Sequence, residues 1–228
     1  PEPVALFVGG CVRDALVGRP VRDIDIATAL LPETVADRLT AAGLKAIPTG
    51  IAHGTVIAVA DGQPFEITTL RVDVRTDGRH AEVAFTDDWA GDAARRDLTM
   101  NALYCDRDGR IFDPCDGLAD LRAGQVRFVG DAATRIREDV LRLLRFYRFH
   151  AWYGSSDPDP AGVAATRELA HLLPTLSAER VAAEVLRLLG APDPLPAVRL
   201  MEDGGVLDHL FTASRMPARL AALVAIEG

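Results

Sequence analysis

The chain has 228 residues, of which 49% are hydrophobic and 25% are charged, as in a globular protein long enough to bury a sizeable core. Its 25 basic and 33 acidic residues give a formal net charge of −8, which excludes a protein that attracts nucleic acid or anionic membranes over its whole surface. The 3 cysteines include no Cys-x-x-Cys pair, which excludes a disulfide framework and a structural zinc site. The single lysine, Lys45, follows Leu44 and not the glycine that a P-loop requires, which excludes a P-loop.

Up to about residue 130, short β-rich segments alternate with helical patterns, which predicts a mixed sheet flanked by helices. A helix is expected over 32–42, because Pro32 lies near its start and Gly43 lies just past its end. Residues 71–82 are polar and predict a mobile loop or an open hairpin. The expected strands cover residues 5–8, 24–27, 55–60 and 65–70.

From residue 131 onward the strand signals end and the pattern is helical, so the fold class is α+β with a helical second half. Glycine and proline separate the expected helices. These helices cover residues 132–152, 161–173, 178–189 and 195–203.

No membrane span or signal peptide is expected. The apolar stretch at 4–12 is far shorter than the roughly 20 residues that cross a bilayer, and Arg13 follows it directly. Together with the cysteine pattern, this favours a reducing cytoplasm. The chain lacks an initiator methionine and ends abruptly at Gly228, so we expect it to be part of a longer polypeptide.

The first chemical signal is a strand that ends in Gly9 and Gly10 and is followed by a helix. Such a turn exposes backbone N–H groups that a triphosphate can approach closely. Asp23 and Asp25 would share one face of the next strand, where mutual repulsion favours a divalent cation between them. Alone, this Asp-x-Asp pattern is more typical of a solvated strand end or turn, and the preceding glycines favour the cation.

Glu66 is an acid inside an apolar run, which predicts that it needs a partner or a metal. The plain alternative is a salt bridge to Arg71. Three acids with a Gly-Gly turn fit a two-metal centre for phosphoryl transfer.

Five segments resemble, in order, the motifs of class II tRNA nucleotidyltransferases, the family of the CCA-adding enzymes and the bacterial poly(A) polymerases. The segments are 9–14 with 23–25, 95–102, 113–121, 138–145 and 177–184. The departures are Leu98, where an aromatic residue is usual, and Cys115, which interrupts the third motif. The resemblance implies a nucleotidyltransferase head (1–130), a helical neck with a base-reading helix (131–190) and the start of a helical body (191–228).

The resemblance also implies a role for each matching residue. Asp23 and Asp25, with Glu66 as the third carboxylate, would bind catalytic Mg²⁺. The implied nucleotide-binding residues are Gly9, Gly10, Arg13, Arg95, Arg96, Asp97, Asn101, Asp139, Arg142 and Arg145. The substrates would be CTP, ATP and the tRNA 3′ end. The plain alternative for residues 95–97 is a solvated charge cluster at a helix start.

Asp139 and Arg142 are expected at i and i+3 of one helix, so they would project from one face, and Arg145 would extend it by a turn. Residues 133–150 hold 5 arginines against 2 acids, a local excess of positive charge where a nucleic-acid end and a nucleotide could meet. The alternative is an intrahelical ion pair on a solvated face.

Within the family, the local sequence favours CCA addition over polyadenylation. Residues 49–55 and 66–71 resemble the CCA-adding type, and 71–82 corresponds to a flexible element needed for the final A. His53 is equally compatible with a structural role. The alternative function is a poly(A) polymerase. A non-catalytic RNA-binding remnant would predict a broken acid triad, whereas Asp23, Asp25 and Glu66 are all present.

Overall fold

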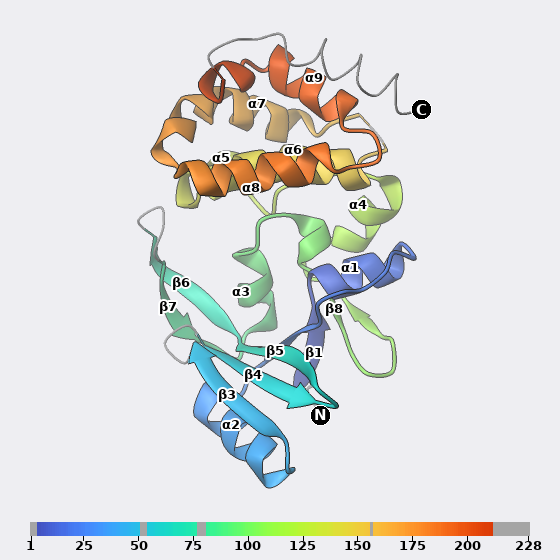
Figure 1. Cartoon of the computed structure of the whole chain (residues 1–228), viewed down its shortest axis with the longest axis vertical. Helices are drawn as coiled ribbons and strands as arrows, with labels where there is room; N and C mark the ends of the chain where they lie inside the picture. Colours follow the sequence, from blue (N-terminus) through green and yellow to red (C-terminus); the bar gives the residue numbers. More distant parts are fainter. Residues whose placement is uncertain (1–3, 51–53, 77–80, 156, 212–228) are drawn as a thin grey trace. The chain divides into compact units, whose positions relative to one another are not determined.

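The computed structural model describes residues 4–50, 54–76, 81–155 and 157–211. The chain divides into two compact units, residues 1–118 and 119–228 (Figure 1). The first contains the sheets and the second is built from helices, as the sequence predicts.

A seven-stranded mixed sheet forms the centre of the first unit. Its strand order is β3-β4-β5-β2-β1-β8-β9. Strand β2 pairs with β5 in parallel, and the other neighbouring strands run antiparallel. The strands are β1 (Ala5–Val8), β2 (Asp25–Thr28), β3 (Lys45–Gly50), β4 (Thr55–Ala60), β5 (Gln63–Thr69), β8 (Tyr104–Cys105) and β9 (Ile111–Phe112). The parallel pair requires a crossover, which the chain supplies through α2 (Pro32–Ala41), β3 and β4.

A second, two-stranded sheet pairs β6 (Arg71–Thr76) with β7 (Ala81–Phe85), so the polar segment is a hairpin rather than a loop. The residues between the strands, 77–80, lie outside the described part of the chain. Figure 1 shows this hairpin leading away from the larger sheet.

Helices cover the sheet and its edges. Helix α2 packs against β3, β4 and β5, and α1 packs against β1 (Figure 1). Val56, Leu70, Leu98 and Leu103 are fully buried, so Leu98, which departs from the family pattern, fills a core position. The helices are α1 (Gly10–Leu16), α2 (Pro32–Ala41), α3 (Trp89–Ala94), the 3₁₀ turn η2 (Thr99–Asn101) and α4 (Gly117–Ala123).

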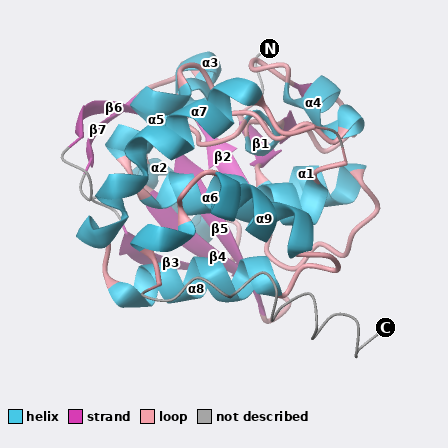
Figure 2. Ribbon diagram, turned by 90° about the horizontal axis from the view of Figure 1, so that it is seen from above, coloured by secondary structure: helices cyan, strands magenta, loops and turns pink. Residues whose placement is uncertain are grey.

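The second unit packs around α6, which lies between α5 and α8 in Figure 2 and contacts both. Leu143, Leu144, Phe146 and Tyr147 on α6 are buried, and the Tyr147 hydroxyl lies 2.8 Å from Oγ1 of the fully buried Thr166. The helices are α5 (Ala132–Glu138), α6 (Leu141–Tyr153), α7 (Pro160–Leu169), η3 (Ala170–Thr175), α8 (Ala178–Leu189), α9 (Leu195–Asp203) and η4 (Leu207–His209).

The predicted single helix over 132–152 is wrong, because the helix breaks at Asp139 and Val140. Asp139 has an extended backbone, with φ −150° and ψ 107°, and its carboxylate accepts a hydrogen bond from the Leu141 N–H at 3.1 Å. An aspartate carboxylate that accepts from the backbone N–H two residues later forms a local turn. Asp139 is therefore the C-cap of α5 and forms a turn into α6, whose own N-cap is Val140.

Gly117 is required by close packing in the third motif. A Cβ at this position would lie 2.0 Å from the carbonyl oxygen of Thr99, while Asp113 accepts from the N–H groups of Gly117 and Leu118 at 2.8 and 2.9 Å. We expect Gly117→Ala to lower the free energy of unfolding by roughly 2–3 kcal/mol through overpacking.

Urea denaturation measures this loss, with Gly190→Ala as the control. At Gly190 the nearest atom to a built Cβ is a carbonyl oxygen at an ordinary 3.5 Å, so that change should have a small effect. Equal stabilities of the two variants would contradict the packing argument.

Candidate active site

Asp25 and Glu66 occupy paired positions on the two parallel strands β2 and β5. Directly paired residues of neighbouring strands project from the same face of a sheet, so the two carboxylates lie side by side. Burial raises the pKa of Asp25, and the nearby charges of Glu66 and Asp23 raise it further, while Arg96 acts in the opposite direction. This carboxylate pair therefore favours either a shared proton or a bound cation.

Two details differ from the sequence-based expectation. Asp23 precedes β2, which begins at Asp25, so the two aspartates do not share a strand face. Glu66 is exposed rather than buried, and it makes no ion pair with Arg71 in the described part of the chain. Apolar neighbours in the sequence misled the burial prediction because β5 has one side open to a cavity.

That cavity has a volume of about 250 Å³ and carries acids and arginines on its wall. Its charged side chains come from β2, β5, β6 and the end of α3. The lining residues are Val8, Asp25, Ile26, Ala27, Glu66, Thr68, Arg71, Asp92, Arg95 and Arg96. Carboxylates suit a cation and guanidinium groups suit phosphate, so one cavity offers ligands for both parts of a metal-nucleotide complex.

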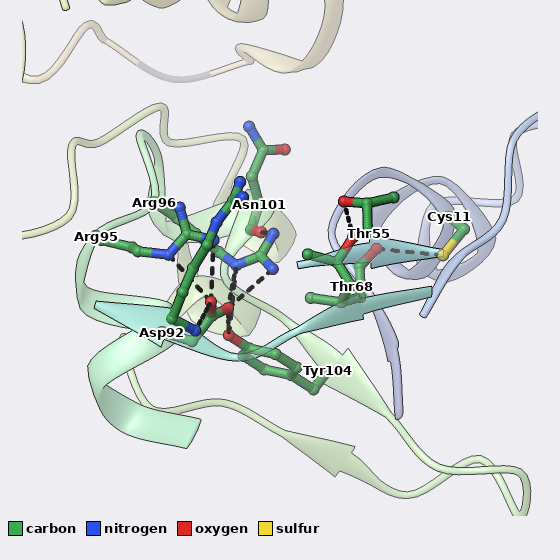
Figure 3. A network of polar contacts seen from close by, with 10 residues as sticks. Cys11, Thr55, Thr68, Asp92, Arg95, Arg96, Asn101 and Tyr104 are labelled. Carbon is green, nitrogen blue, oxygen red and sulfur yellow. Dashed lines mark hydrogen bonds and ion pairs between the residues drawn. The ribbon is translucent and has the colours of Figure 1, made fainter. Parts of the chain in front are cut away.

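Asp92 organises the arginines of this wall (Figure 3). Its Oδ1 accepts from Nε and Nη2 of Arg95, both at 3.0 Å, and from the backbone N–H of Arg71 at 3.3 Å. Its Oδ2 accepts from Nη2 of Arg96 at 3.0 Å and from the Tyr104 hydroxyl at 2.7 Å. Two guanidinium groups are thus fixed by one carboxylate.

The charges in this network stabilise one another. Burial alone would raise the pKa of Asp92, but Arg96 and Arg95 overcome this effect, and the pKa is lowered overall. Burial, with Asp92 adding to it, raises the pKa of Tyr104, so its hydroxyl remains a donor at neutral pH. The carboxylate is therefore ionised and satisfied although its side chain is only 2% exposed.

A second buried network joins Arg13, Asn101 and Asp97. Nη1 of Arg13 donates to Oδ1 of Asn101, and Nδ2 of Asn101 donates to Oδ1 of Asp97 at 3.1 Å. All three are buried, at 7% or 8% exposure. The structure brings these three predicted nucleotide-binding residues together, at the point where α1 meets η2.

Gly9 and Gly10 connect the first motif to the arginine cluster. Gly9 has φ +73° and precedes α1, and a Cβ added to it would lie 3.4 Å from Nη1 of Arg96. Nη1 of Arg96 also donates to the carbonyl oxygen of Asn101 at 3.4 Å. The absence of side chains at the turn leaves room for Arg96 beside the backbone of the first motif.

The predicted base-reading residues lie in the second unit, in and after the break between α5 and α6. Asp139 accepts from Nη2 of Arg180 at 2.9 and 3.0 Å, and Nη1 of Arg142 donates to Glu138 at 2.6 Å. The guanidinium of Arg145 lies 5.3 Å from the centre of the Phe149 ring. The expectation that Asp139 and Arg142 share one continuous helical face is wrong because the helix is interrupted at Asp139.

Sequence reasoning missed Asp92, Tyr104 and Arg180. Asp92 carried a usable signal, since it precedes the two arginines by three and four residues on a helix, a spacing at which side chains meet. Tyr104 meets Asp92 in the first unit, and Arg180 meets Asp139 in the second, only through tertiary packing. His53 lies outside the described residues.

The described residues contain no ready-made group of three or more His, Cys, Asp or Glu side chains that could hold an ion. Asp25 and Glu66 provide a pair, and Asp23 is near enough to influence the pKa of Asp25. Oxygen ligands of this kind suit a hard divalent cation that keeps several of its waters.

Comparison with known proteins defines the class. The model of the poly(A) polymerase head domain matches residues 5–127, and a model described as the probable RNA and SrmB-binding site of polymerase A matches residues 157–215. The chain therefore belongs to the poly(A) polymerase head-domain family, which includes the class II tRNA nucleotidyltransferases that its motifs resemble. Nucleotidyltransferases of this family generally use divalent metal ions.

Individual proteins similar to this chain carry more specific names than the family models. The chain is 43% identical over 207 residues to the mitochondrial CCA tRNA nucleotidyltransferase 1 of Mus musculus, covering 90% of this chain and 48% of that protein. It is 40% identical over 225 residues to the CCA-adding enzyme of Geobacillus stearothermophilus, covering 96% and 54%. The chain spans about half the length of the curated relatives it matches.

A solved structure is also similar. The crystal structure of the Bacillus stearothermophilus CCA-adding enzyme in complex with CTP matches with a TM-score of 0.84 and 37% identity, covering 97% of this chain and 53% of that one. The similarity confirms the predicted fold class of a mixed sheet flanked by helices and followed by helices. No helix in the described ranges is long and apolar enough to cross a membrane.

Proposed function

We propose that this chain is the head and neck of a CCA tRNA nucleotidyltransferase, which extends a tRNA 3′ end with nucleotides from CTP and ATP and releases pyrophosphate. The observation that carries the proposal is the pairing of Asp25 with Glu66 on parallel strands, in a cavity that Arg95 and Arg96 also line. We assign the head to residues 1–130, the neck to 131–190 and the start of the body to 191–228.

In this proposal Asp25, Glu66 and Asp23 hold Mg²⁺. When bound, the ion would lower the pKa of the primer 3′-hydroxyl and offset the charge that develops on the α-phosphate. The raised pKa of Asp25 supports the assignment, because a cation relieves the repulsion that raises it.

Arg95 and Arg96 face the same cavity and bind the triphosphate oxygens, since guanidinium groups match phosphate in shape and charge. Gly9 and Gly10 let the phosphates approach the backbone beside Arg96. The second network, with Arg13, Asp97 and Asn101, completes the phosphate and ribose contacts. Because Asp97 and Asn101 are held by each other, they offer fixed polar groups rather than mobile ones.

Base selection is assigned to Asp139 and Arg142, with Arg145 extending the surface. Arg180 holds Asp139, and Glu138 holds Arg142, so each group is fixed before a nucleotide arrives. The side chains of Asp139 and Arg142 are 31% and 16% exposed, which leaves both within reach of a ligand.

Two other readings have less support. A poly(A) polymerase would share the catalytic centre, but the similar proteins are named as CCA-adding enzymes or CCA tRNA nucleotidyltransferases. A non-catalytic remnant would not need the three acids. We propose the cytoplasm as the compartment on the cysteine pattern, while vertebrate relatives are named as mitochondrial.

The direct test uses the full-length protein with tRNA that lacks its 3′ CCA, labelled CTP and ATP, and sequencing of the products. We expect two C residues and one A, after which addition stops. A long A tail without C would establish the alternative function. No addition with intact tRNA binding would support the non-catalytic reading.

We also expect residues 1–228 to bind tRNA weakly. The net charge is −8, and several arginines of the basic segment are already paired, including Arg137 with Glu168 and Arg148 with Glu184. With about three phosphate contacts, affinity should fall roughly 40-fold between 50 and 200 mM salt. Filter binding decides this, and tight, salt-resistant binding would contradict it.

A further inference from the structure

The cavity holds opposite charges that have not paired across it. Asp25 and Glu66 lie on its wall with Arg95 and Arg96, yet neither acid makes an ion pair in the described ranges. Arg96 lies close enough to Asp25 for the two charges to interact. Something must therefore keep these guanidinium groups from closing onto the carboxylates.

Asp92 is the side chain that does so. Its Oδ1 accepts hydrogen bonds from Nε and Nη2 of Arg95, and its Oδ2 accepts one from Nη2 of Arg96. Both guanidinium groups are therefore bound to this one carboxylate. The Tyr104 hydroxyl donates a hydrogen bond of 2.7 Å to the same carboxylate and helps to fix its orientation. The side chain of Asp92 is 2% exposed, so water hardly weakens its hydrogen bonds and ion pairs.

We propose that Asp92 is a positioning residue that holds Arg95 and Arg96 on the phosphate side of the cavity and thereby keeps Asp25 and Glu66 open for a divalent cation. The inference deepens the proposed function and rests on it. Because Asp92 holds the two guanidinium groups, the Asp25 and Glu66 pair keeps its negative charge for the ion.

A purely structural role is the competing explanation. A buried carboxylate with two arginine partners also ties α3 to β8, and its removal would destabilise any fold. A second substitution, at Arg96, distinguishes a positioning role of Asp92 from a purely structural one. If a released Arg96 blocks the carboxylates, removal of Arg96 restores cation binding, but it cannot restore a damaged fold.

The experiment measures Mn²⁺ binding to the nucleotide-free full chain by electron paramagnetic resonance of the free ion. We expect Asp92→Asn to weaken Mn²⁺ binding about tenfold or more, and the double variant Asp92→Asn/Arg96→Gln to return it to within about threefold of the original protein. Glu184→Gln is the matched control, because Glu184 is a 3% exposed acid that also pairs with two arginines, Arg148 and Arg187, in the other unit. It should lose stability without losing Mn²⁺ affinity.

Unchanged Mn²⁺ binding in Asp92→Asn, or weakened binding that Arg96→Gln fails to restore, would overturn the inference. If Asp92→Asn does not fold, Asp92→Glu keeps the charge but displaces both guanidinium groups, and we expect a loss of about threefold that Arg96→Gln again restores; unchanged binding there would also overturn it. Failure of the proposed metal site is a separate result, seen if Asp25→Asn leaves Mn²⁺ binding of the parent protein unaltered.

Discussion

Asp25→Asn should lower the rate of nucleotide addition by at least about 10³-fold while leaving the metal-free protein as stable as before or slightly more stable. The loss follows from removing an oxygen ligand at the parallel β2–β5 pair. The stability follows from the electrostatics, since burial, Glu66 and Asp23 all raise the pKa of Asp25 and thus disfavour its charged form in the fold.

Because the pKa of Asp25 is raised in the folded protein, the folded state binds more protons than the unfolded state between the ordinary pKa and the raised value. Stability from this group therefore falls as the pH rises through that interval. Asparagine does not titrate, so Asp25→Asn removes this loss of stability. We expect the variant to have a higher melting temperature than the parent protein at neutral pH, and the difference to disappear in acid.

Asp61→Asn is the matched control, because Asp61 lies in the β4–β5 turn with φ 50°, which asparagine tolerates. It should change neither property. Retention of more than a few per cent of the activity in Asp25→Asn would contradict the assignment of Asp25 as a metal ligand. Unfolding of that variant would contradict the electrostatic account.

The second large effect concerns the choice of base. Replacing Asp139 and Arg142 together by alanine should relax the preference for C and A over G and U, which can reach about 10⁴-fold where a site is built around specific hydrogen bonds. A carboxylate only accepts and a guanidinium only donates. Cytosine and adenine present an amino donor beside a ring-nitrogen acceptor, whereas guanine and uracil present a carbonyl acceptor beside an N–H donor.

The structure changes how this pair is held but not its chemistry. Arg180 and Glu138 fix the two groups across the helix break, in place of the continuous helix that the sequence predicted. The measurement is incorporation from each of the four nucleoside triphosphates, with Arg137→Ala as a control for loss of positive charge on the same segment. If the double variant rejects GTP and UTP as strictly as the parent, these residues are not the base-reading pair.

Secondary-structure elements were predictable where hydrophobic alternation or terminal Pro and Gly residues mark them in the local sequence. The alternation at β4 and the Pro and Gly signals around α2 placed these elements closely. Strand β3 contains Pro48 and lies at an edge of the sheet, where proline is tolerated but the sequence signal is weak. Strands β8 and β9 have two residues each, which is too short for any periodicity.

The site was predictable in its residue types but not in its arrangement. The acids and arginines followed from the motifs, whereas the register that sets Asp25 beside Glu66 depends on a parallel pairing across some forty residues of chain. The exposure of Glu66 and the break at Asp139 depend on tertiary contacts that no local pattern contains. Asp92 could have been found from its helical spacing to the two arginines.

We propose that the Asp25 and Glu66 pair holds the ion that CTP brings to the cavity with Arg95 and Arg96. Crystals of the protein grown with Mn²⁺ and CTP, measured for anomalous scattering from manganese, test it most directly. We predict an anomalous peak within about 2.5 Å of carboxylate oxygens of both Asp25 and Glu66, with the triphosphate against Arg95 and Arg96. A manganese peak elsewhere, or a triphosphate bound away from this cavity, would contradict the account.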